Sequence, residues 1–599
     1  MSTQSYTADI ADIQFVLFEQ LRIHETLHDT FPDYDRDTLD AVIDQAREIA
    51  EGVLSPINRP GDAAGASFDG EGNVRVPAGF KEAWDTLASG GWIGVSAPLE
   101  AGGSGMPHTV HAVTNELFFG AASAFMMYPG LTAAGANMML RYGPEATRAM
   151  VTQKMLSGVW SGTMCLTEAG AGSDVGANRA RALRTDEPGV YLLEGEKIFI
   201  SGGDQDMTEN IIHIILARTP DAPAGTKGLS LFMVPKFLFD ADGNLGARNG
   251  AWVGNIEHKM GINGSATCTV LLGDRGPCRA WLIGKEGEGM ALMFHMMNEA
   301  RLGVAIQSLG IAANAYNNAL SYASERKQGS TLEQMRDANA PRAAIIQHPD
   351  VRRMLLWQKC QIEAMRSLAY KLGFWADRIA AGSEDEGAAL TERIDLLTPV
   401  AKAHCSDVAF ECAVQALQVF GGYGFIREYP VEQHVRDAKI CSIYEGTNGI
   451  QAMDLLGRKM RMRGGGVFMD WMAYAASICA SGREAGFEAE AGAIDKAIQQ
   501  TGATAMFLGG LGMQGKLTTA MLHATPFLRQ MGTVALALES LDQAVTAKRL
   551  LDAGEGSDTA RGKLLNLRFY VHNILPQATA IGKGIQSDDG AALDDALFA

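Results

Sequence analysis

Hydrophobic positions in the first 160 residues follow a helical period. The apolar residues of one early segment recur at steps of three or four: Leu39, Val42, Ile43, Ala46 and Ile49. This spacing places them on one face of a helix. Stretches rich in Gly and Pro predict loops at 56–70 and 99–107. We therefore expect an α-helical domain over residues 1–160.

The pattern changes after Trp160, where short apolar runs alternate with turn residues. These runs are rich in β-branched and aromatic residues, and turns with Gly, Asp, Asn or Pro separate them: 190–193, 211–215, 229–234 and 267–272. Such runs are typical of strands. A middle β domain is expected over residues 161–285.

The helical period returns at Gly289 and continues along the rest of the chain. Met293, Met296 and Met297 begin an apolar stripe that predicts a buried core. A run of three glycines at 464–466 indicates a further boundary. The pattern predicts a helical domain over 286–463, an additional helical domain over 464–599, and an α+β protein.

One stretch, from Leu117 to Leu140, has 24 residues without a charge and could span a bilayer by length. Pro129, Asn137 and interspersed glycines make it only moderately apolar. We expect a pair of buried helices interrupted at glycine, and no membrane span.

Composition narrows the classes of protein that fit. The 599 residues are 47% hydrophobic and 20% charged, as in globular proteins, and the net charge of −18 argues against a chain-wide surface for nucleic acid. The eight cysteines include no C-x-x-C pair, which favours reduced thiols and a cytoplasmic protein. Residues 1–9 have no basic stretch followed by an apolar one, so no secretion signal is expected.

Two literal motif matches lack their chemical context. His24-Glu-Thr-Leu-His28 fits the zinc-protease pattern, but no third ligand follows, and we expect an exposed turn without metal. Gly510-Leu-Gly-Met-Gln-Gly515 fits a dinucleotide fingerprint, but the preceding residues predict a helix rather than a strand. A loop between helices is the preferred interpretation.

Two segments of the β domain and one turn further on are stronger candidates for a site. The glycines of Cys165–Gly176 allow close approach of a bound group, and Glu196–Gly203 puts an aromatic ring and a hydroxyl at a strand end. Glu445, followed by Gly446, can place a carboxylate in an apolar cleft, where burial would suit it to proton abstraction. Taken singly, each has an ordinary explanation as a turn or a solvated loop.

The combination of four segments resembles the acyl-CoA dehydrogenase family from about Leu39 to Arg463. The segments occur in the family's order and spacing: Thr167–Val175, Glu325–Gln328, Gln418–Gly424 and Arg436–Thr447. The length and the helical extension after 463 look most like the bacterial subgroup that includes 3-methylmercaptopropionyl-CoA dehydrogenases. The resemblance implies an N-terminal helical domain, a central β-barrel or sandwich, a four-helix bundle and an extra helical domain.

The resemblance also implies FAD as cofactor and an acyl-CoA thioester as substrate. The residues it assigns to FAD are Met164, Leu166, Thr167, Gly172, Ser173, Phe199, Ile200, Ser201 and Thr447, with Arg326, Gln418, Gly421 and Gly422 reaching the FAD of a neighbouring subunit. The residues it assigns to substrate are Ser173, Arg301, Tyr444 and Gly446. Glu445 would take the α-proton while flavin N5 takes the β-hydride, leaving a trans-2-enoyl-CoA.

Several positions depart from the family pattern. Phe199 stands where Trp is usual, Ala169 where Pro is frequent and Gly449 where Gln is frequent, and a shortened segment ends at Gly329. Some relatives place their base immediately before an arginine matching Arg301. That position here is Ala300, and Glu299 is on a different helix face.

The resemblance implies a homodimer and an electron-transfer flavoprotein as electron acceptor. Residues 464–599 would cover a surface that shorter relatives use for tetramer formation. Two rival functions remain open at this stage: an acyl-CoA oxidase that passes electrons to O₂, and a non-catalytic flavoprotein.

Overall fold

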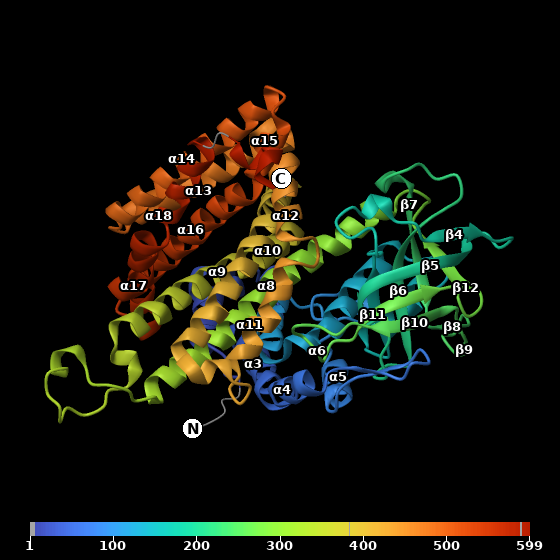
Figure 1. Cartoon of the computed structure of the whole chain (residues 1–599), viewed down its shortest axis with the longest axis horizontal. Coiled ribbons are helices and arrows are strands. Elements are labelled where there is room, and N and C mark those ends of the chain that lie inside the picture. The colour runs from blue at the N-terminus through green and yellow to red at the C-terminus, as the bar shows by residue number, and fades with distance from the viewer. Residues whose placement is uncertain (1–5, 383, 588–589, 599) are drawn as a thin grey trace. The chain divides into compact units, whose positions relative to one another are not determined.

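The computed structural model describes residues 6–382, 384–587 and 590–598. Met1–Ser5, on which the expected absence of a secretion signal partly depends, lie outside the described residues. The helices are α1 Ile10–Gln14, α2 Ile23–Thr26, α3 Arg36–Ile49, α4 Ser55–Ala64, α5 Phe80–Ser89, α6 His108–Tyr142, α7 Arg148–Leu156, α8 Gly289–Glu325, α9 Pro349–Ala381, α10 Glu384–Phe420, α11 Val431–Lys439, α12 Asn448–Gly457, α13 Gly466–Glu484, α14 Glu488–Met513, α15 Leu517–Leu522, α16 Ala524–Asp552, α17 Asp558–Asn573 and α18 Pro576–Ser587 (Figure 1). The strands are β1 Ser67–Phe68, β2 Val74–Arg75, β3 Trp160–Cys165, β4 Arg181–Arg184, β5 Val190–Ser201, β6 Asn210–Arg218, β7 Leu229–Pro235, β8 Phe237–Phe239, β9 Leu245–Arg248, β10 Ala251–Ile256, β11 Thr267–Leu272 and β12 Cys278–Ile283.

The chain divides into two compact units. One comprises residues 46–303 and holds all the described strands, and the other comprises residues 1–45 and 304–599 and is helical. The order of a helical region, a β region and further helices confirms the α+β class expected from the sequence.

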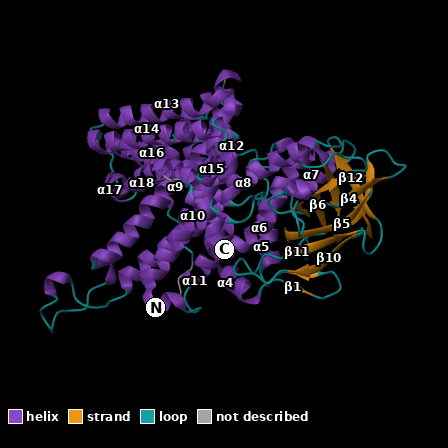
Figure 2. Ribbon diagram, turned by 45° about the horizontal axis from the view of Figure 1, so that its top comes forward, coloured by secondary structure: helices purple, strands orange, loops and turns teal. Residues whose placement is uncertain are grey.

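The β region of unit 46–303 is an eight-stranded sheet. Its strands follow the order β10-β11-β5-β12-β7-β6-β3, with β4 beside β5 and β6. β5 pairs with β12 through residues 190–193 and with β11 from Gly195 onward. Gly195 has φ +131, and a Cβ there would lie 3.0 Å from Ala180 Cα, so only glycine fits where β5 changes partners. In Figure 2 the strands gather into one β domain, with α6 and α7 beside it.

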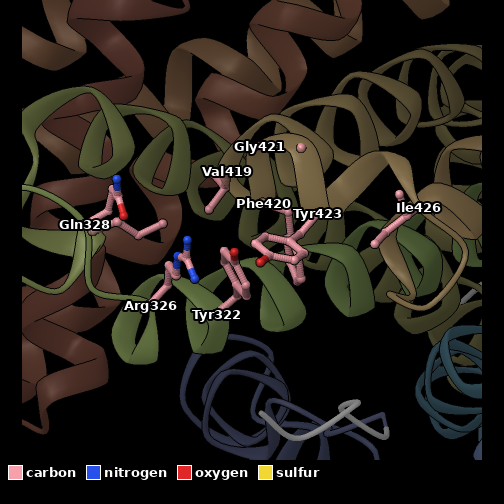
Figure 3. Close-up of a pocket in the computed structure, with 10 residues that line it drawn as sticks. Tyr322, Arg326, Gln328, Val419, Phe420, Gly421, Tyr423 and Ile426 are labelled. Carbon is pink, nitrogen blue, oxygen red and sulfur yellow. The ribbon is translucent and has the colours of Figure 1, made fainter.

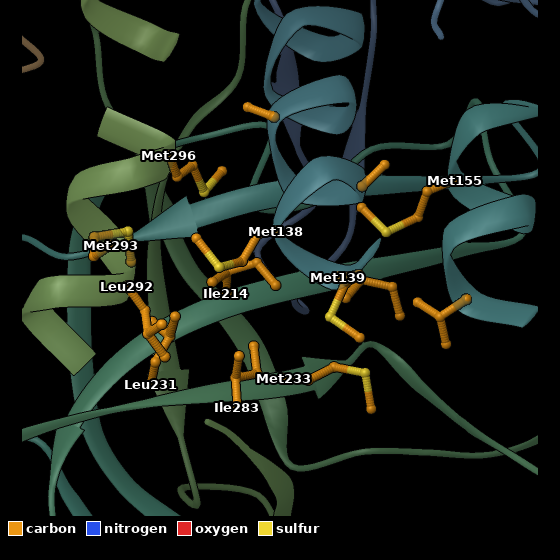
Figure 4. Close-up of a cluster of buried hydrophobic side chains, with 14 of the residues drawn as sticks. Met138, Met139, Met155, Ile214, Leu231, Met233, Ile283, Leu292, Met293 and Met296 are labelled. Carbon is orange, nitrogen blue, oxygen red and sulfur yellow. The ribbon is translucent and has the colours of Figure 1, made fainter. Parts of the chain in front are cut away.

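A methionine-rich core joins the β domain to its flanking helices. Met138 and Met139 of α6 pack with Ile214 of β6 and with Met293 and Met296 of α8 (Figure 4). The last two are less than 2% exposed, which confirms the buried stripe expected from the sequence. Unbranched methionine side chains fill irregular gaps between a sheet and helices.

The uncharged stretch from Leu117 lies within α6, in which two helices meet at a kink, as the expected helix pair requires. Its interruption is at Ala122, whose φ of −150° and ψ of 74° are not helical, and not at a glycine. Among the described residues, α6 is the one helix long and apolar enough to cross a membrane, and 83% of its most apolar window is buried within the structure. Burial against the β domain explains its composition.

The predicted loop at 56–70 is wrong in its first half, because α4 continues to Ala64. Pro56 occupies the first turn, where a helix needs no N–H from it. The short hairpin of β1 and β2 was also not predicted within the first helical region. Gly510 and Gly512 lie in the last turn of α14, which ends at Met513, so the expected loop between helices holds only Gly515 of this motif.

Buried ion pairs tie the start of the chain to its last 60 residues. Asp12 of α1 contacts Arg366 of α9 and Lys563 of α17, and Lys563 Nζ also lies 2.6 Å from an oxygen of Glu363. The four side chains are at most 4% exposed. Burial alone would raise the pKa of Asp12, but Lys563 and Arg366, together with Lys359, outweigh it and lower the pKa to about 2. We name these four residues the Asp12 cluster.

All eight cysteines are buried and unpaired in the structure. Burial raises the pKa of Cys165 and of Cys268 to about 12. These thiols are therefore packed as small apolar side chains rather than poised as nucleophiles.

Candidate functional site

The glycine-rich segment Cys165–Gly176 begins where β3 ends. Leu166 and Thr167 are half-buried, while Gly172 and Ser173 are exposed. A Cβ added to Gly170 would meet no atom within 4 Å, and one added to Gly172 only a methyl group at 3.9 Å. The segment therefore begins with the half-buried Leu166 and Thr167 and continues with a main chain that is open to a ligand at Gly170 and Gly172.

The second predicted segment, at the end of β5, lies beside the first. The Ile198 N–H donates to the Thr167 carbonyl at 2.9 Å. Phe199 has a left-handed φ of 58° and its side chain is 59% exposed, although it is aromatic. Ile200 is buried, and its carbonyl accepts from the Gly203 N–H at 3.3 Å. An exposed ring on a strained backbone is suited to lie against a flat bound group.

Glu445 lies on a strained turn between two short helices of the other unit. Glu445 has φ 56° and Gly446 has φ 80°, and the first costs on the order of 1–3 kcal/mol in a residue other than glycine. Gln451 donates to the Glu445 carbonyl at 3.1 Å, and Lys402 donates to the Gly446 carbonyl at 2.8 Å. These bonds hold the half-buried Glu445 in a conformation that it would not adopt freely.

The residues on either side of Glu445 are fixed as well. The Tyr444 hydroxyl donates to Gln307 of α8, and burial raises the pKa of Tyr444 well above its usual range, so the hydroxyl stays protonated. Thr447 caps α12 by accepting from the Ile450 N–H at 3.2 Å. The turn is therefore anchored by a helix start on one side and a buried phenol on the other.

Lys402, Gln451 and Gln307 support the turn but were not identified from the sequence. Lys402 is fully buried in α10 and also donates to Asn448 at 3.0 Å. A lone lysine inside the apolar run Leu396–Ala403 was the available signal, because a charge in such a run must find a partner when it is buried.

A pocket of 480 Å³ lies beside the Gly421–Gly422 turn that follows α10. Arg326 lines it together with Tyr322 and Tyr423, and the guanidinium lies 5.2 Å from the Tyr423 ring (Figure 3). No atom lies within 4 Å of a Cβ added to either glycine, so the backbone is open to a ligand. Gln418 is exposed on the preceding turn of α10 but does not line the pocket.

Two further candidates, Glu299 and Arg301, belong to unit 46–303. Glu299 accepts from Asn137 of α6 at 3.2 Å. Desolvation raises the pKa of Glu299, whereas Asn137 and Arg141 act against this increase. Arg301 is 2% exposed and donates to Asn298 at 3.4 Å.

The predicted residues thus form two groups, one in each compact unit. The group in residues 46–303 is Met164, Leu166, Thr167, Gly172, Ser173, Phe199, Ile200, Ser201 and Arg301. The group in the helical unit is Arg326, Gln418, Gly421, Gly422, Tyr444, Glu445, Gly446 and Thr447.

The zinc-protease pattern does not form the helix that its chemistry needs. α2 ends at Thr26, so His24 and His28 do not share a helix face, and the His24 ring packs edge-on against Phe18. Within the described ranges, no group of three His, Cys, Asp or Glu side chains has an arrangement that could hold a metal.

Domain profiles of one protein family match most of the chain. They are the N-terminal domain over 36–159, the middle domain over 163–274 and the C-terminal domain over 287–460 of acyl-CoA dehydrogenase, followed by a C-terminal domain like that of acetyl-CoA dehydrogenase over 469–595. The chain belongs to the acyl-CoA dehydrogenase family.

Individual relatives cover nearly the whole length. The butyryl-CoA dehydrogenase of Syntrophomonas wolfei is 37% identical over 99% of both chains. The 3-methylmercaptopropionyl-CoA dehydrogenase of Ruegeria pomeroyi is 36% identical over 96% of this chain and 97% of its own. A solved structure of Caenorhabditis elegans ACDH-11 with C11-CoA covers 99% of this chain and 97% of its own with a TM-score of 0.72, and at 18% identity it supports the fold alone.

Membership of this family makes the protein an oxidoreductase that dehydrogenates acyl-CoA thioesters with FAD as cofactor. The resemblance seen in the sequence, including its subgroup, is thereby confirmed. An acyl-CoA substrate and an electron-transfer partner follow from the same relationship.

Proposed function

We propose that Glu445 is the base that removes the α-proton of the acyl-CoA substrate. The strained Glu445–Gly446 turn is the observation that supports this assignment, because supporting bonds from Gln451 and Lys402 hold a carboxylate residue in an unfavourable conformation. The Glu445 backbone N–H is the chain's own donor to the thioester carbonyl oxygen, where charge develops as the proton leaves. The Glu445→Gln variant described in the Discussion tests the assignment.

The open glycine backbones and the exposed Phe199 ring fit a flat cofactor with an anionic tail. Met164, Leu166, Thr167, Phe199, Ile200 and Ser201 would hold the flavin ring, with Gly172, Ser173 and Thr447 contacting the cofactor near it. Arg326, Gln418, Gly421 and Gly422 would hold the FAD of a neighbouring subunit, since the pocket beside them combines a cation with open backbone. When bound, FAD supplies the acceptor for the hydride that leaves the β-carbon.

The substrate contacts that we propose are Ser173, Arg301, Tyr444 and Gly446. Ser173 is exposed and can donate to the pantetheine portion of CoA. Tyr444, held by Gln307, keeps the turn in place while the acyl chain enters. Binding energy from the remote CoA would align the α- and β-hydrogens for removal.

Purified protein is expected to be yellow, with about one FAD per chain and no stoichiometric zinc. The cofactor segments are present, whereas His24 and His28 do not share a helix. Absorbance after acid release of the flavin and elemental analysis give the two contents. A colourless protein that does not take up FAD, or a preparation with one zinc per chain, contradicts the assignment.

We propose that the acyl group is a linear chain or 3-methylmercaptopropionate, and that an electron-transfer flavoprotein accepts the electrons. The relatives named above act on butyryl-CoA and 3-methylmercaptopropionyl-CoA by name. A further relative, 30% identical over 64% of this chain, is named as a subunit of a caffeyl-CoA reductase–Etf complex of Acetobacterium woodii. These names support the choice of substrates to test first.

With an artificial electron acceptor, butyryl-CoA and 3-methylmercaptopropionyl-CoA should be among the best substrates by kcat/KM in a panel of thioesters. In air without acceptor, turnover and peroxide formation should be slow. Fast peroxide formation would favour the oxidase alternative, and no turnover of any thioester by FAD-loaded protein would favour a non-catalytic flavoprotein.

We propose a homodimer, because Arg326 and Gln418 would complete the FAD site of a neighbouring subunit. Light scattering of the FAD-loaded protein should give twice the chain mass of 64.0 kDa. Charge reversal in the Arg326→Glu variant should lower FAD occupancy without altering the far-ultraviolet circular dichroism. A monomer with full FAD occupancy would be incompatible with the shared site.

We also propose the four-part division into residues 1–160, 161–285, 286–463 and 464–599, which the ranges of the family profiles support. The cytoplasm is the compartment that we propose, since eight buried, unpaired thiols are typical of a reducing environment.

A further inference from the structure

A buried ion pair lies behind the glycine-rich segment of the β domain. Lys197 of β5 is fully buried, and its Nζ lies 2.7 Å from Oε1 of Glu168, whose side chain is 10% exposed. Burial lowers the pKa of Lys197, and Glu168 opposes this decrease. An apolar residue would fill this interior position without the cost of desolvating a charge. The lysine therefore calls for an explanation beyond packing.

Lys197 donates to the main chain as well as to the carboxylate. Its Nζ lies 3.1 Å from the Leu166 carbonyl, which also accepts from Asn178 at 2.7 Å. Glu168 in turn accepts from the main-chain N–H groups of Arg179 at 2.6 Å and Ala180 at 3.0 Å. Leu166 and Glu168, on either side of Thr167, are thus both bonded to Lys197.

This arrangement determines which way the Thr167 amide points. In a planar trans peptide the carbonyl of one residue and the N–H of the next point in opposite directions. Because Lys197 holds the Leu166 carbonyl, the Thr167 N–H is directed away from Lys197. The same lysine is two residues before Phe199, so it also couples the two segments that carry Thr167 and Phe199.

We propose that Lys197 is a positioning residue for the flavin: it orients the Thr167 amide and sets the spacing between the Thr167 and Phe199 segments. The inference rests on the proposed assignment of these segments to FAD. Lys197 itself does not need to touch the cofactor. Its effect reaches the flavin through the main chain of Leu166 and Thr167.

The test compares FAD binding and the visible spectrum of bound flavin in the Lys197→Met variant and the wild type. Hydrogen bonds to charged groups predict a loss of FAD affinity of about 10- to 100-fold. The flavin that remains bound should show an altered visible spectrum and a shifted midpoint potential. The double variant Lys197→Met/Glu168→Gln leaves no buried unpaired charge and replaces the single variant in the test if that variant does not fold.

Lys236→Met is the matched control. Lys236 pairs with the buried Asp204 in the same unit, and its side chain is 14% exposed, so its loss also removes a cation from a buried carboxylate, although Arg248 remains 3.8 Å from Asp204. We expect it to lower the melting temperature while leaving the flavin spectrum unchanged. Lys197→Arg, which keeps the charge and the donors, should restore part of the affinity.

Thr167→Ala separates the failure of this inference from failure of the proposed function. If Thr167→Ala alters the flavin spectrum but Lys197→Met, or the double variant that replaces it, leaves spectrum and affinity unchanged, Lys197 is not a positioning residue. If Lys236→Met changes the spectrum as much as Lys197→Met, the effect is general destabilisation and the inference is wrong. If neither Thr167→Ala nor the Lys197 variants affects the flavin, the segment does not bind FAD and the proposed site itself is wrong.

Discussion

Replacing Glu445 with Gln is expected to slow flavin reduction by about a hundred- to ten-thousandfold. Gln keeps the size of the side chain and most of its hydrogen bonds but cannot take a proton. The strained main chain of the turn is held by Gln451 and Lys402 through carbonyl groups, which the substitution leaves in place. FAD content and acyl-CoA binding should therefore remain near those of the wild type.

The measurement is anaerobic bleaching of the flavin after rapid mixing with substrate. Glu299→Gln is the matched control, since it makes the same change in a carboxylate that accepts from Asn137 of α6. It should bleach at close to the wild-type rate. If bleaching is lost only in the Glu299 variant, Glu299 of α8 is the base. If both variants bleach normally, neither carboxylate is the base.

Replacing Lys563 with Met is expected to destabilise the helical unit by about 3–5 kcal/mol, the range for breaking a buried ion pair. Lys563 contacts Asp12 and Glu363, and both carboxylates are at most 4% exposed. Without Lys563, the carboxylates of Asp12 and Glu363 stay buried as long as the surrounding helices remain packed, and each has lost one of its cations. The midpoint of urea unfolding should fall, because the substitution removes the ion pair between Asp12 of α1 and Lys563 of α17.

Lys548→Met provides the control for that measurement. Lys548 pairs with Asp552 on the surface of α16, with side chains 38% and 63% exposed, so its loss should cost less than about 1 kcal/mol. Equal urea midpoints for the two variants would mean that the Asp12 cluster contributes no more than a surface pair.

The Asp12 cluster also predicts acid sensitivity. The pKa of Asp12 is lowered from 3.8 to about 2 in the folded protein. A carboxyl with a lowered pKa stabilises the fold fully above its unfolded pKa, and this contribution is lost as the pH falls from about 4 to about 2. In the Lys563→Met variant, the free energy of unfolding should fall less between about pH 4 and about pH 2 than it does in the wild type.

Local sequence patterns predicted the fold class because helices, strands and turns depend on near neighbours, whereas the candidate site segments were assigned from their combined resemblance to a family. The strand runs at 190–193 and 211–215 became parts of β5 and β6, and the methionine stripe became core. The Glu445–Gly446 turn was recognisable because glycine beside a carboxylate residue marks a local conformation.

The partners of Lys402 and Lys197 could not be predicted because they are distant in the chain. Lys402 binds a carbonyl 44 residues away, and Lys197 pairs with a carboxylate 29 residues away. The position of the interruption in α6 was also missed, since Ala122 has no sequence signal for a non-helical backbone. Tertiary packing overrides local preference at such positions.

The pairing of Asp12 with Lys563 has a consequence for the order in which the protein is made. The two residues are 551 positions apart. At the usual pace of translation, roughly 5–20 residues per second, Asp12 emerges from the ribosome about half a minute to two minutes before Lys563 is added. Arg366 is itself 354 positions after Asp12, so for most of that interval the first helix lacks both cations, and it lacks Lys563 until the end. The N-terminal segment therefore cannot complete its packing until synthesis is almost finished.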